Sequence, residues 1–357
     1  MTDPFRSAEP FPPGEFLRRE LDSRGWTEGE FAQILDRPAQ ALSEILNGKK
    51  SITTETAVEF GEALGTSPDV WLALQNEYRL SQTRERQEGL SPVARRARLR
   101  SLVPVRELQR RGWLPDDKDL DVLERSVTEL LGIDSLDERP SFLAAARRTN
   151  PDDQLTPEQT AWLARVTNLA REVEVGEYRR DMLEELAERL VHDIVNVHDL
   201  HHLQAWLAAC GVALVVVAPL RSSKIDGVSM MVDGTPVVGL SARGDRMDAF
   251  VFTLLHELAH LLLGHLDGGG VNLDENIGDP DGSEREQDAN ERAANWILPK
   301  EFSLPGRPNT AAVLAAAQAY GVHTCFVVGR LQREEVLGWN EMRRLVPKVR
   351  PYLEMGE

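Results

Sequence analysis

Two histidines four residues apart, His256 and His260, and the glutamate that follows the first of them have the spacing of a metal site. On a helix, side chains four residues apart share a face, with Cβ atoms roughly 5–6 Å apart, so two imidazoles can bind one small cation together. The Glu257 carboxylate then falls beside a water bound to that cation, where a general base is needed. A bound Zn²⁺ lowers the pKa of its water from about 15.7 to about 7. These residues predict a zinc hydrolase site with Glu257 as the catalytic base.

The run of residues around this motif, from Phe250 to Gly264, is apolar, long and regular enough to predict a buried helix. A five-residue motif can arise by chance, and two histidines at this spacing can also cap or solvate a helix. Three polar side chains among Leu, Val, Phe and Ala would, however, be costly to bury without a partner. The uninterrupted apolar segments of the chain are also too short to span a bilayer. The pattern therefore favours a buried metal site.

A catalytic zinc needs three protein ligands and one open position, so a third ligand must lie elsewhere in the sequence. His265 is the nearest further histidine, but it comes one residue earlier than the metzincin pattern places its third histidine. We attribute His265 instead to the end of the helix, where the helix dipole favours it.

A second helix is predicted between Ser283 and Pro299, and its small residues at helical spacing would let it approach the first helix closely. Glu286 and Asn290, four residues apart, would then face the metal. Glu286 would complete a site of two histidines and one carboxylate, and Asn290 could hydrogen-bond a ligating histidine and fix its tautomer. On spacing alone, a solvated Glu286 is the alternative. Three nearby acids are rival ligands: Glu284, Asp288 and Glu291.

The motif His256-Glu-Leu-Ala-His260, followed by Glu286-Gln-Asp-Ala-Asn290, resembles the ImmA/IrrE metallopeptidase family, whose domain has a minimal zincin fold. In that family, the carboxylate that opens the second motif is the third zinc ligand, and it maps onto Glu286. The resemblance therefore implies a zinc site made by His256, His260 and Glu286. It departs at Arg292, where the family usually has a large apolar residue.

Three segments before the motif predict the β-sheet of such a domain. Residues 212–217 form a buried apolar run, and residues 227–232 and 236–241 form a hairpin joined at Asp233-Gly234. A sheet edge of this kind is where a peptide could add as an extra strand. We expect an α+β, gluzincin-like minimal zincin domain over residues 209–357.

The N-terminal part of the chain carries a second motif. Thr27 and Glu30 form a capping box that opens one short helix, and a second amphipathic helix over residues 40–46 ends at Asn47-Gly48. Two short helices joined by a tight turn describe a helix-turn-helix. About residues 10–80 are very similar to the HigA-type antitoxins of the Xre/Cro class, which are commonly dimers. We therefore expect an all-α domain over residues 1–80 and a homodimer.

Binding of this domain to operator DNA depends on its charge, because phosphate neutralisation dominates DNA affinity. Residues 1–80 contain eight Lys or Arg and fourteen Asp or Glu. Gln40 and Ser43 could contact base edges, and Lys49 with Lys50 could hold phosphate. The alternative is a module that serves only for dimerisation or partner binding.

Residues 81–208 predict a helical connector, because apolar residues recur there at helical spacing. Its first part, residues 81–111, holds nine Arg and three Glu. These arginines could extend a DNA footprint. They could also form a solvated helix face that pairs with the acidic domains, which is the usual outcome.

The composition agrees with a multidomain protein. A length of 357 residues exceeds one typical domain, and 41% hydrophobic residues suffice for real cores. A net charge of −17 disfavours binding to anionic membranes, and it disfavours general nucleic-acid binding by most of the chain.

The two cysteines indicate the cellular compartment. Cys210 and Cys325 lie in apolar segments without metal-ligand spacing, which indicates the thiols of a reducing cytosol. The first residues lack the regions of a signal peptide, so we expect a cytoplasmic protein without a membrane segment.

Together, the two motifs predict a transcriptional regulator whose zinc-dependent endopeptidase domain cleaves a protein partner, such as a repressor or a toxin–antitoxin component. The alternative is a non-catalytic, HigA-like DNA-binding antitoxin that neutralises a toxin or senses a ligand. In a third possibility, zinc only braces two helices and there is no substrate.

Overall fold

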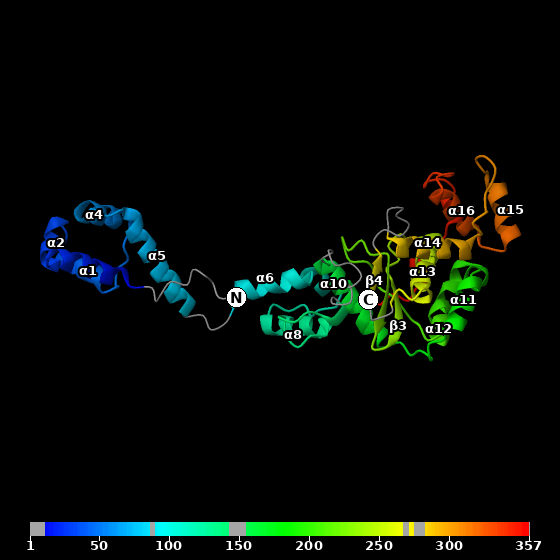
Figure 1. The fold of residues 1–357 in the computed structure, drawn as a ribbon, viewed down its shortest axis with the longest axis horizontal. Helices are drawn as coiled ribbons and strands as arrows, with labels where there is room; N and C mark the ends of the chain where they lie inside the picture. The colour runs from blue at the N-terminus through cyan, green and yellow to red at the C-terminus, as the bar shows by residue number, and fades with distance from the viewer. Residues whose placement is uncertain (1–10, 86–89, 143–154, 267–270, 275–282, 357) are drawn as a thin grey trace. The chain divides into compact units, whose positions relative to one another are not determined.

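The computed structural model describes residues 11–85, 90–142, 155–266, 271–274 and 283–356 (Figure 1). The chain divides into two compact units, Met1–Ala94 and Arg95–Glu357. Each unit has hydrophobic core residues of its own. This is the predicted fold class, because the first unit is all-α and the second contains helices and a small sheet.

The first unit consists of short helices whose ends follow local sequence signals. The Thr27 side chain accepts a hydrogen bond from the Glu30 backbone N–H, and the Glu30 carboxylate accepts one from the Thr27 N–H. The predicted capping box and the two helices of the helix-turn-helix are thereby confirmed. The helices are α1 (Pro13–Arg24), α2 (Glu28–Ile34), α3 (Ala39–Leu46), α4 (Thr54–Leu64) and α5 (Pro68–Glu85).

Aromatic side chains form the centre of this first core. Phe31, Phe60 and Trp71 are fully buried, and Phe60 packs edge-on against Trp71 with ring centroids 5.3 Å apart. The Trp71 indole N–H donates to the Thr66 hydroxyl at 2.8 Å, which satisfies its polar atom. A side chain at Gly14 would collide with the Leu46 carbonyl, so a glycine there lets α1 approach the end of α3.

The second unit contains a four-stranded sheet with the strand order β1-β3-β2-β4. Strand β1 is parallel to β3, whereas β2 is antiparallel to both β3 and β4. The first three strands match the predicted segments, while the short strand β4 was not predicted. The bounds are β1 (Ala213–Val216), β2 (Gly227–Val232), β3 (Thr235–Leu240) and β4 (Val271–Asp274).

The predicted hairpin between β2 and β3 turns at Asp233 and Gly234, as expected. Both residues have positive φ angles, 49° and 87°. A two-residue turn with two positive φ angles suits the right-handed twist of the strands that it joins.

Helices cover both faces of this sheet. Leu214 and Leu240 belong to a core that also contains the apolar side chains of α11, α12 and α13, whereas Val215 and Val237 belong to a core shared with α8 and α10. Figure 1 shows α10 on one side of the sheet and α11 and α13 on the other. The remaining helices of the unit are α6 (Pro92–Leu102), α7 (Val105–Arg110), α8 (Leu120–Leu131), α10 (Pro157–Ala170), α11 (Arg180–Asp193), α12 (Leu203–Ala209), α13 (Met247–Leu262), α14 (Glu284–Ile297), α15 (Thr310–Tyr320) and α16 (Thr324–Arg333), with 3₁₀ turns at Val197–His202, Arg343–Leu345 and Arg350–Tyr352.

The described parts of the predicted connector are largely helical, and two of its helices, α10 and α12, pack against strand β1. Trp162 of α10 is fully buried, and its indole N–H donates to the Val217 carbonyl at the end of β1. The sequence predicted domain boundaries at residues 80 and 208. These two boundaries remain predictions.

Arginines of the basic stretch pair with acidic side chains of the same unit. Arg95 forms ion pairs with Asp121 and Glu124, and Arg98 forms one with Asp137. These contacts agree with the second interpretation of the stretch, a solvated helix face that pairs with acids. Across the described ranges, no single helix is long and apolar enough to cross a membrane; only α15 and α16 taken together, bent by 114°, have the length and composition.

Candidate metal centre

Helix α13 carries the motif of two histidines and a glutamate through the middle of the second unit. Its apolar side chains contact the sheet on one side and neighbouring helices on the other. His256, Glu257 and His260 are all 0% exposed. The predicted buried helix is therefore confirmed, and its three polar side chains belong to its buried face.

Helix α14 packs against α13 and brings Glu286 to the two histidines. The Ser283 hydroxyl caps its first turn by accepting from the Glu286 N–H. Ala289 and Ala293 are 0% exposed, so small side chains line the contact and the two helices can approach closely. Helix α14 ends at Ile297, two residues before Pro299, as predicted.

The nitrogen and oxygen atoms of these three side chains converge on one point. The Nε2 atoms of His256 and His260 are 2.9 Å apart. The Glu286 carboxylate lies 3.2 Å from the first Nε2 and 3.5 Å from the second. One donor atom of each residue lies within 4.8 Å of the others. Zinc ligands at about 2.1 Å in tetrahedral geometry are separated by about 3.4 Å, so this donor set fits a zinc ion.

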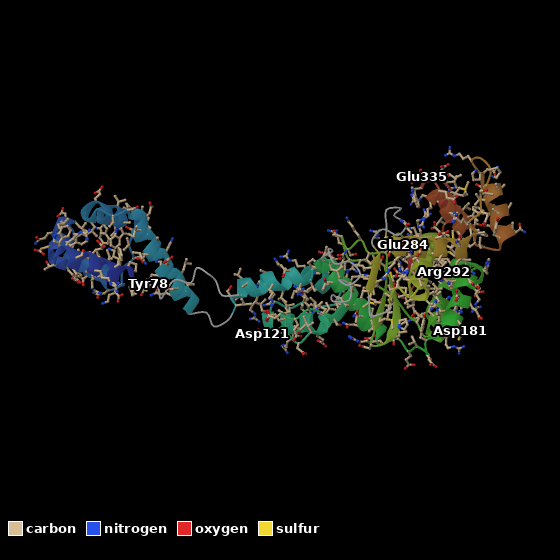
Figure 2. The ribbon with its side chains drawn as sticks, viewed as in Figure 1. Tyr78, Asp121, Asp181, Glu284, Arg292 and Glu335 are labelled. Carbon is tan, nitrogen blue, oxygen red and sulfur yellow. The ribbon has the colours of Figure 1, made fainter. Side chains whose placement is uncertain are left out.

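The rival acids on α14 lie elsewhere. Glu284 is exposed at the start of the helix, where Figure 2 labels it. Asp288 is exposed as well, and Glu291 forms an ion pair with Lys300 at 2.6 Å. Of the candidate carboxylates, the structure brings Glu286 to the histidines.

The environment of Glu286 keeps its carboxyl group ionised. Burial raises its pKa, but hydrogen bonds to His256 and His260 and their charges lower it, so the net pKa lies below the usual range. A carboxylate that stays charged is the form that binds a metal ion.

His265 contacts the site in a way that sequence reasoning missed. Its Nδ1 lies 2.8 Å from Nδ1 of His260, and burial together with the nearby His260 lowers the pKa of the His265 imidazole. In the neutral ring, which is the form that binds a metal ion, donation of the His260 Nδ1–H to His265 leaves the lone pair on Nε2, the atom that lies near Glu286 and His256. The position five residues after His260 suggested only a helix end. The chain turns back at Gly264, whose φ is 74°, and this turn makes the contact possible.

Glu257 lies against the beginning of strand β2. A Cβ atom added at Gly227 would collide with Oε1 of Glu257 and with the Thr253 methyl group. Glycine at this position therefore leaves the space that the Glu257 side chain occupies, a requirement that the sequence did not reveal.

Two other residues of α14, Asn290 and Arg292, were also singled out from the sequence. Asn290 Oδ1 is buried, and within the described residues it has no hydrogen-bond partner, so its predicted contact with a ligating histidine stays a prediction. Arg292, labelled in Figure 2, pairs with Glu184 of α11 and lies over the Trp296 ring at 5.1 Å. The unusual arginine is thus accommodated by an acid and an aromatic ring.

The predicted DNA contacts lie on and after α3. Gln40 is exposed, Ser43 is half-buried, and Lys49 and Lys50 are exposed just after the helix. The Ser43 hydroxyl accepts a hydrogen bond from the Asn47 amide, so part of its hydrogen-bonding capacity is already used.

Comparisons with known proteins agree with both halves of this description. Residues 212–332 match the peptidase family model described as the IrrE N-terminal-like domain, and residues 17–71 match the helix-turn-helix model. Virulence-associated protein A′ of Dichelobacter nodosus is 42% identical over 83 residues, which are 23% of this chain and 72% of that protein. The HTH-type transcriptional regulator YddM of Escherichia coli is 33% identical over 70 residues, which are 20% of this chain and 74% of that protein. Among solved structures, an addiction module antidote protein of the HigA family from Coxiella burnetii is 29% identical, with a TM-score of 0.20, and covers 23% of this chain and 100% of its own.

Proposed function

Since this chain belongs to the HTH-type transcriptional regulators through its N-terminal domain and also carries an IrrE N-terminal-like domain, we propose that it is a regulator with a zinc-dependent endopeptidase activity. Its substrate would be a protein partner, such as a repressor or a component of a toxin–antitoxin pair.

One observation carries the peptidase proposal. Two buried imidazoles and a carboxylate from the neighbouring helix hold their donor atoms within 4.8 Å of one another. A set of two histidines and one carboxylate leaves a fourth position open, as catalytic zinc sites require. A purely structural zinc site would more often be closed by four protein ligands.

Each residue of the site has a proposed role. His256, His260 and Glu286 hold the metal. When bound, zinc polarises a peptide carbonyl and makes a water molecule more acidic. Glu257 accepts the proton of the attacking water and passes it to the leaving amine, which is the work of a general base followed by a general acid. Strand β4 lies at one edge of the sheet, where an extended substrate could add as a further strand.

The substitution Glu257→Gln tests the chemistry. It removes the base but keeps the shape of the side chain, so we expect stoichiometric zinc by mass spectrometry together with loss of cleavage. Comparing the proteomes of cells with the native chain and with Glu257→Gln should reveal the substrate as a protein that accumulates with the variant. Equal proteomes, and no cleavage by the native protein, would favour the alternative, a non-catalytic antitoxin-like binding protein.

We also propose that the N-terminal domain binds operator DNA as a homodimer. The match to the helix-turn-helix model supports this role, and the exposed Lys49 and Lys50 offer phosphate contacts. The double substitution Lys49→Ala and Lys50→Ala should weaken binding to DNA from upstream of its own gene. It should also reduce the dependence of log K on log salt by about 4, because each of the two protomers loses two phosphate contacts. If the salt dependence of DNA binding is unchanged, the N-terminal domain would instead serve to bind protein partners.

A further inference from the structure

A cleft of about 590 Å³ lies between α7 and the loop that joins β1 to β2. Five cationic side chains and a single carboxylate, that of Glu107, line it. This concentration of positive charge contrasts with the net charge of −17 of the chain. The cations are Arg110, Arg111, Arg221, Lys224 and Arg243.

Two of these cations are already paired and serve to build the cleft. Arg111 forms an ion pair with Glu107 at 3.0 Å and donates to the carbonyls of Ala218 and Pro219, so it ties the loop to α7. Arg243 binds Asp226 through two hydrogen bonds, of 2.9 Å and 2.8 Å. Both carboxylates near the loop are therefore engaged.

The other three cations form no ion pair with an acid in the part of the chain that the structure describes. Arg110, Arg221 and Lys224 are exposed, and no carboxylate of the described residues lies within ion-pair distance of any of them. Like charges that share one cleft repel each other, and an anion that binds among them removes this repulsion.

The loop holds its cations in a fixed arrangement. Buried Leu220, Ser223 and Ile225 anchor it to the core, and the residues between them point outward. Lys224 has a φ of 57°, which is rare for a residue with a side chain and persists only where the surroundings impose it. In addition, the backbone N–H of Arg221 donates to Glu107 at 3.1 Å. The cleft is thus organised before any ligand arrives.

From this arrangement we infer that the cleft is a binding site for a small polyanion that carries at least two phosphate groups. Its volume lies within the range of about 300–1,000 Å³ that is typical of small-molecule sites. Guanidinium groups bind phosphate oxygens through paired, charge-assisted hydrogen bonds, which gives a phosphate ester an advantage over a monovalent anion.

The surroundings favour a small ligand over nucleic acid. A DNA-binding surface needs basic residues along an extended track. Here the loop that follows α7 carries the exposed acids Asp116 and Asp117, and the Gln109 amide holds this loop against the helix by donating to the Asp117 carbonyl. A strand of DNA that left the cleft on this side would meet negative charge.

Titration calorimetry of the full chain with inorganic tripolyphosphate at constant ionic strength tests the inference. The double variant Arg221→Ala, Lys224→Ala removes two unpaired cations, while Arg343→Ala, Arg344→Ala removes two exposed cations outside the cleft. We expect one binding site in the native protein and in the control variant, and at least tenfold weaker binding in the cleft variant. Circular dichroism should show the same fold for all three proteins.

Equal affinities for the two double variants would overturn the inference, because binding would then reflect overall charge. A duplex oligonucleotide whose binding is lost in the cleft variant and kept in the control would also overturn it, by assigning the cleft to nucleic acid. Neither result depends on peptidase activity, so the test is independent of the proposed function.

Discussion

The side chains of His256, His260 and Glu286 make a compact donor set because two packed helices, α13 and α14, position them. The two histidines are four residues apart on α13, so helical geometry alone places them on one face. Glu286 reaches them from α14, and its half-buried carboxylate lies within 3.5 Å of both Nε2 atoms.

Replacing Glu286 with alanine should lower zinc affinity by more than about a hundredfold, because it removes a direct ligand rather than a supporting group. Zinc competition with a chromogenic chelator measures this affinity. The matched control is Glu284→Ala, an exposed acid two residues away on the same helix. A similar loss of zinc affinity in both variants would mean that the negative charge of α14 attracts the metal and that Glu286 does not coordinate it.

His265 should support zinc binding through His260. Removing the group that accepts the Nδ1–H of a ligating histidine typically costs about ten- to a hundredfold in metal affinity. We therefore expect His265→Ala to weaken zinc binding within this range and His265→Asn, which retains a hydrogen-bond acceptor, to restore part of it. If His265→Ala binds zinc as the native protein does, the 2.8 Å contact has no role in positioning.

Among the elements, the close packing of α13 on β2 and on α14 depends on small residues at particular points. Ala289 and Ala293 permit the approach of α14, and Gly227 makes room for Glu257 at the start of β2. The loop before Gly227 also lines the basic cleft. The segment that joins β1 to β2 therefore contributes both to this cleft and to the position of Glu257.

The substitution Gly227→Ala should impair cleavage without loss of zinc. Its added methyl group would displace the Glu257 carboxylate, and a shift of about 1 Å at a catalytic group can cost about a hundredfold in rate. Cleavage rate and zinc content are to be measured together. Gly244→Ala is the matched control, because a Cβ there meets no atom within 4 Å. Unimpaired cleavage by Gly227→Ala would argue against Glu257 as the base.

At the level of the complete chain, the two units have separate cores and only the second contains the candidate metal centre. A ligand that binds only the folded state stabilises by RT ln(1 + [L]/Kd), about 4 kcal/mol at a thousandfold excess over Kd. This stabilisation should act on the unit that holds the ligand.

Calorimetric unfolding of the full chain should therefore show two transitions, of which chelation by EDTA lowers only one by several degrees. The affected transition should be that of Arg95–Glu357, and the isolated N-terminal unit should melt identically with and without EDTA. A single transition that shifts as a whole would mean that the two units unfold together.

Local sequence patterns were enough to predict α2 and α3 of the helix-turn-helix, α13 and α14 of the metal site, the β2–β3 hairpin, and the two histidines with their glutamate. A capping box such as Thr27 with Glu30, a turn such as Asp233-Gly234, and a pair of histidines four residues apart all depend on neighbours within about one helical turn. Glu286 could be chosen among its acidic neighbours only with the help of a family resemblance, because spacing alone does not orient one helix against another.

Long-range packing determined the rest. The space that Gly227 leaves for Glu257, the pairing of strand β4 with β2 and the cleft of five cations each join segments that are far apart in the sequence, and no local pattern encodes their proximity. The physical reason is that such contacts form only when the burial of apolar faces brings the segments together. Which segments meet is determined by the packing of all the helices and strands of the core.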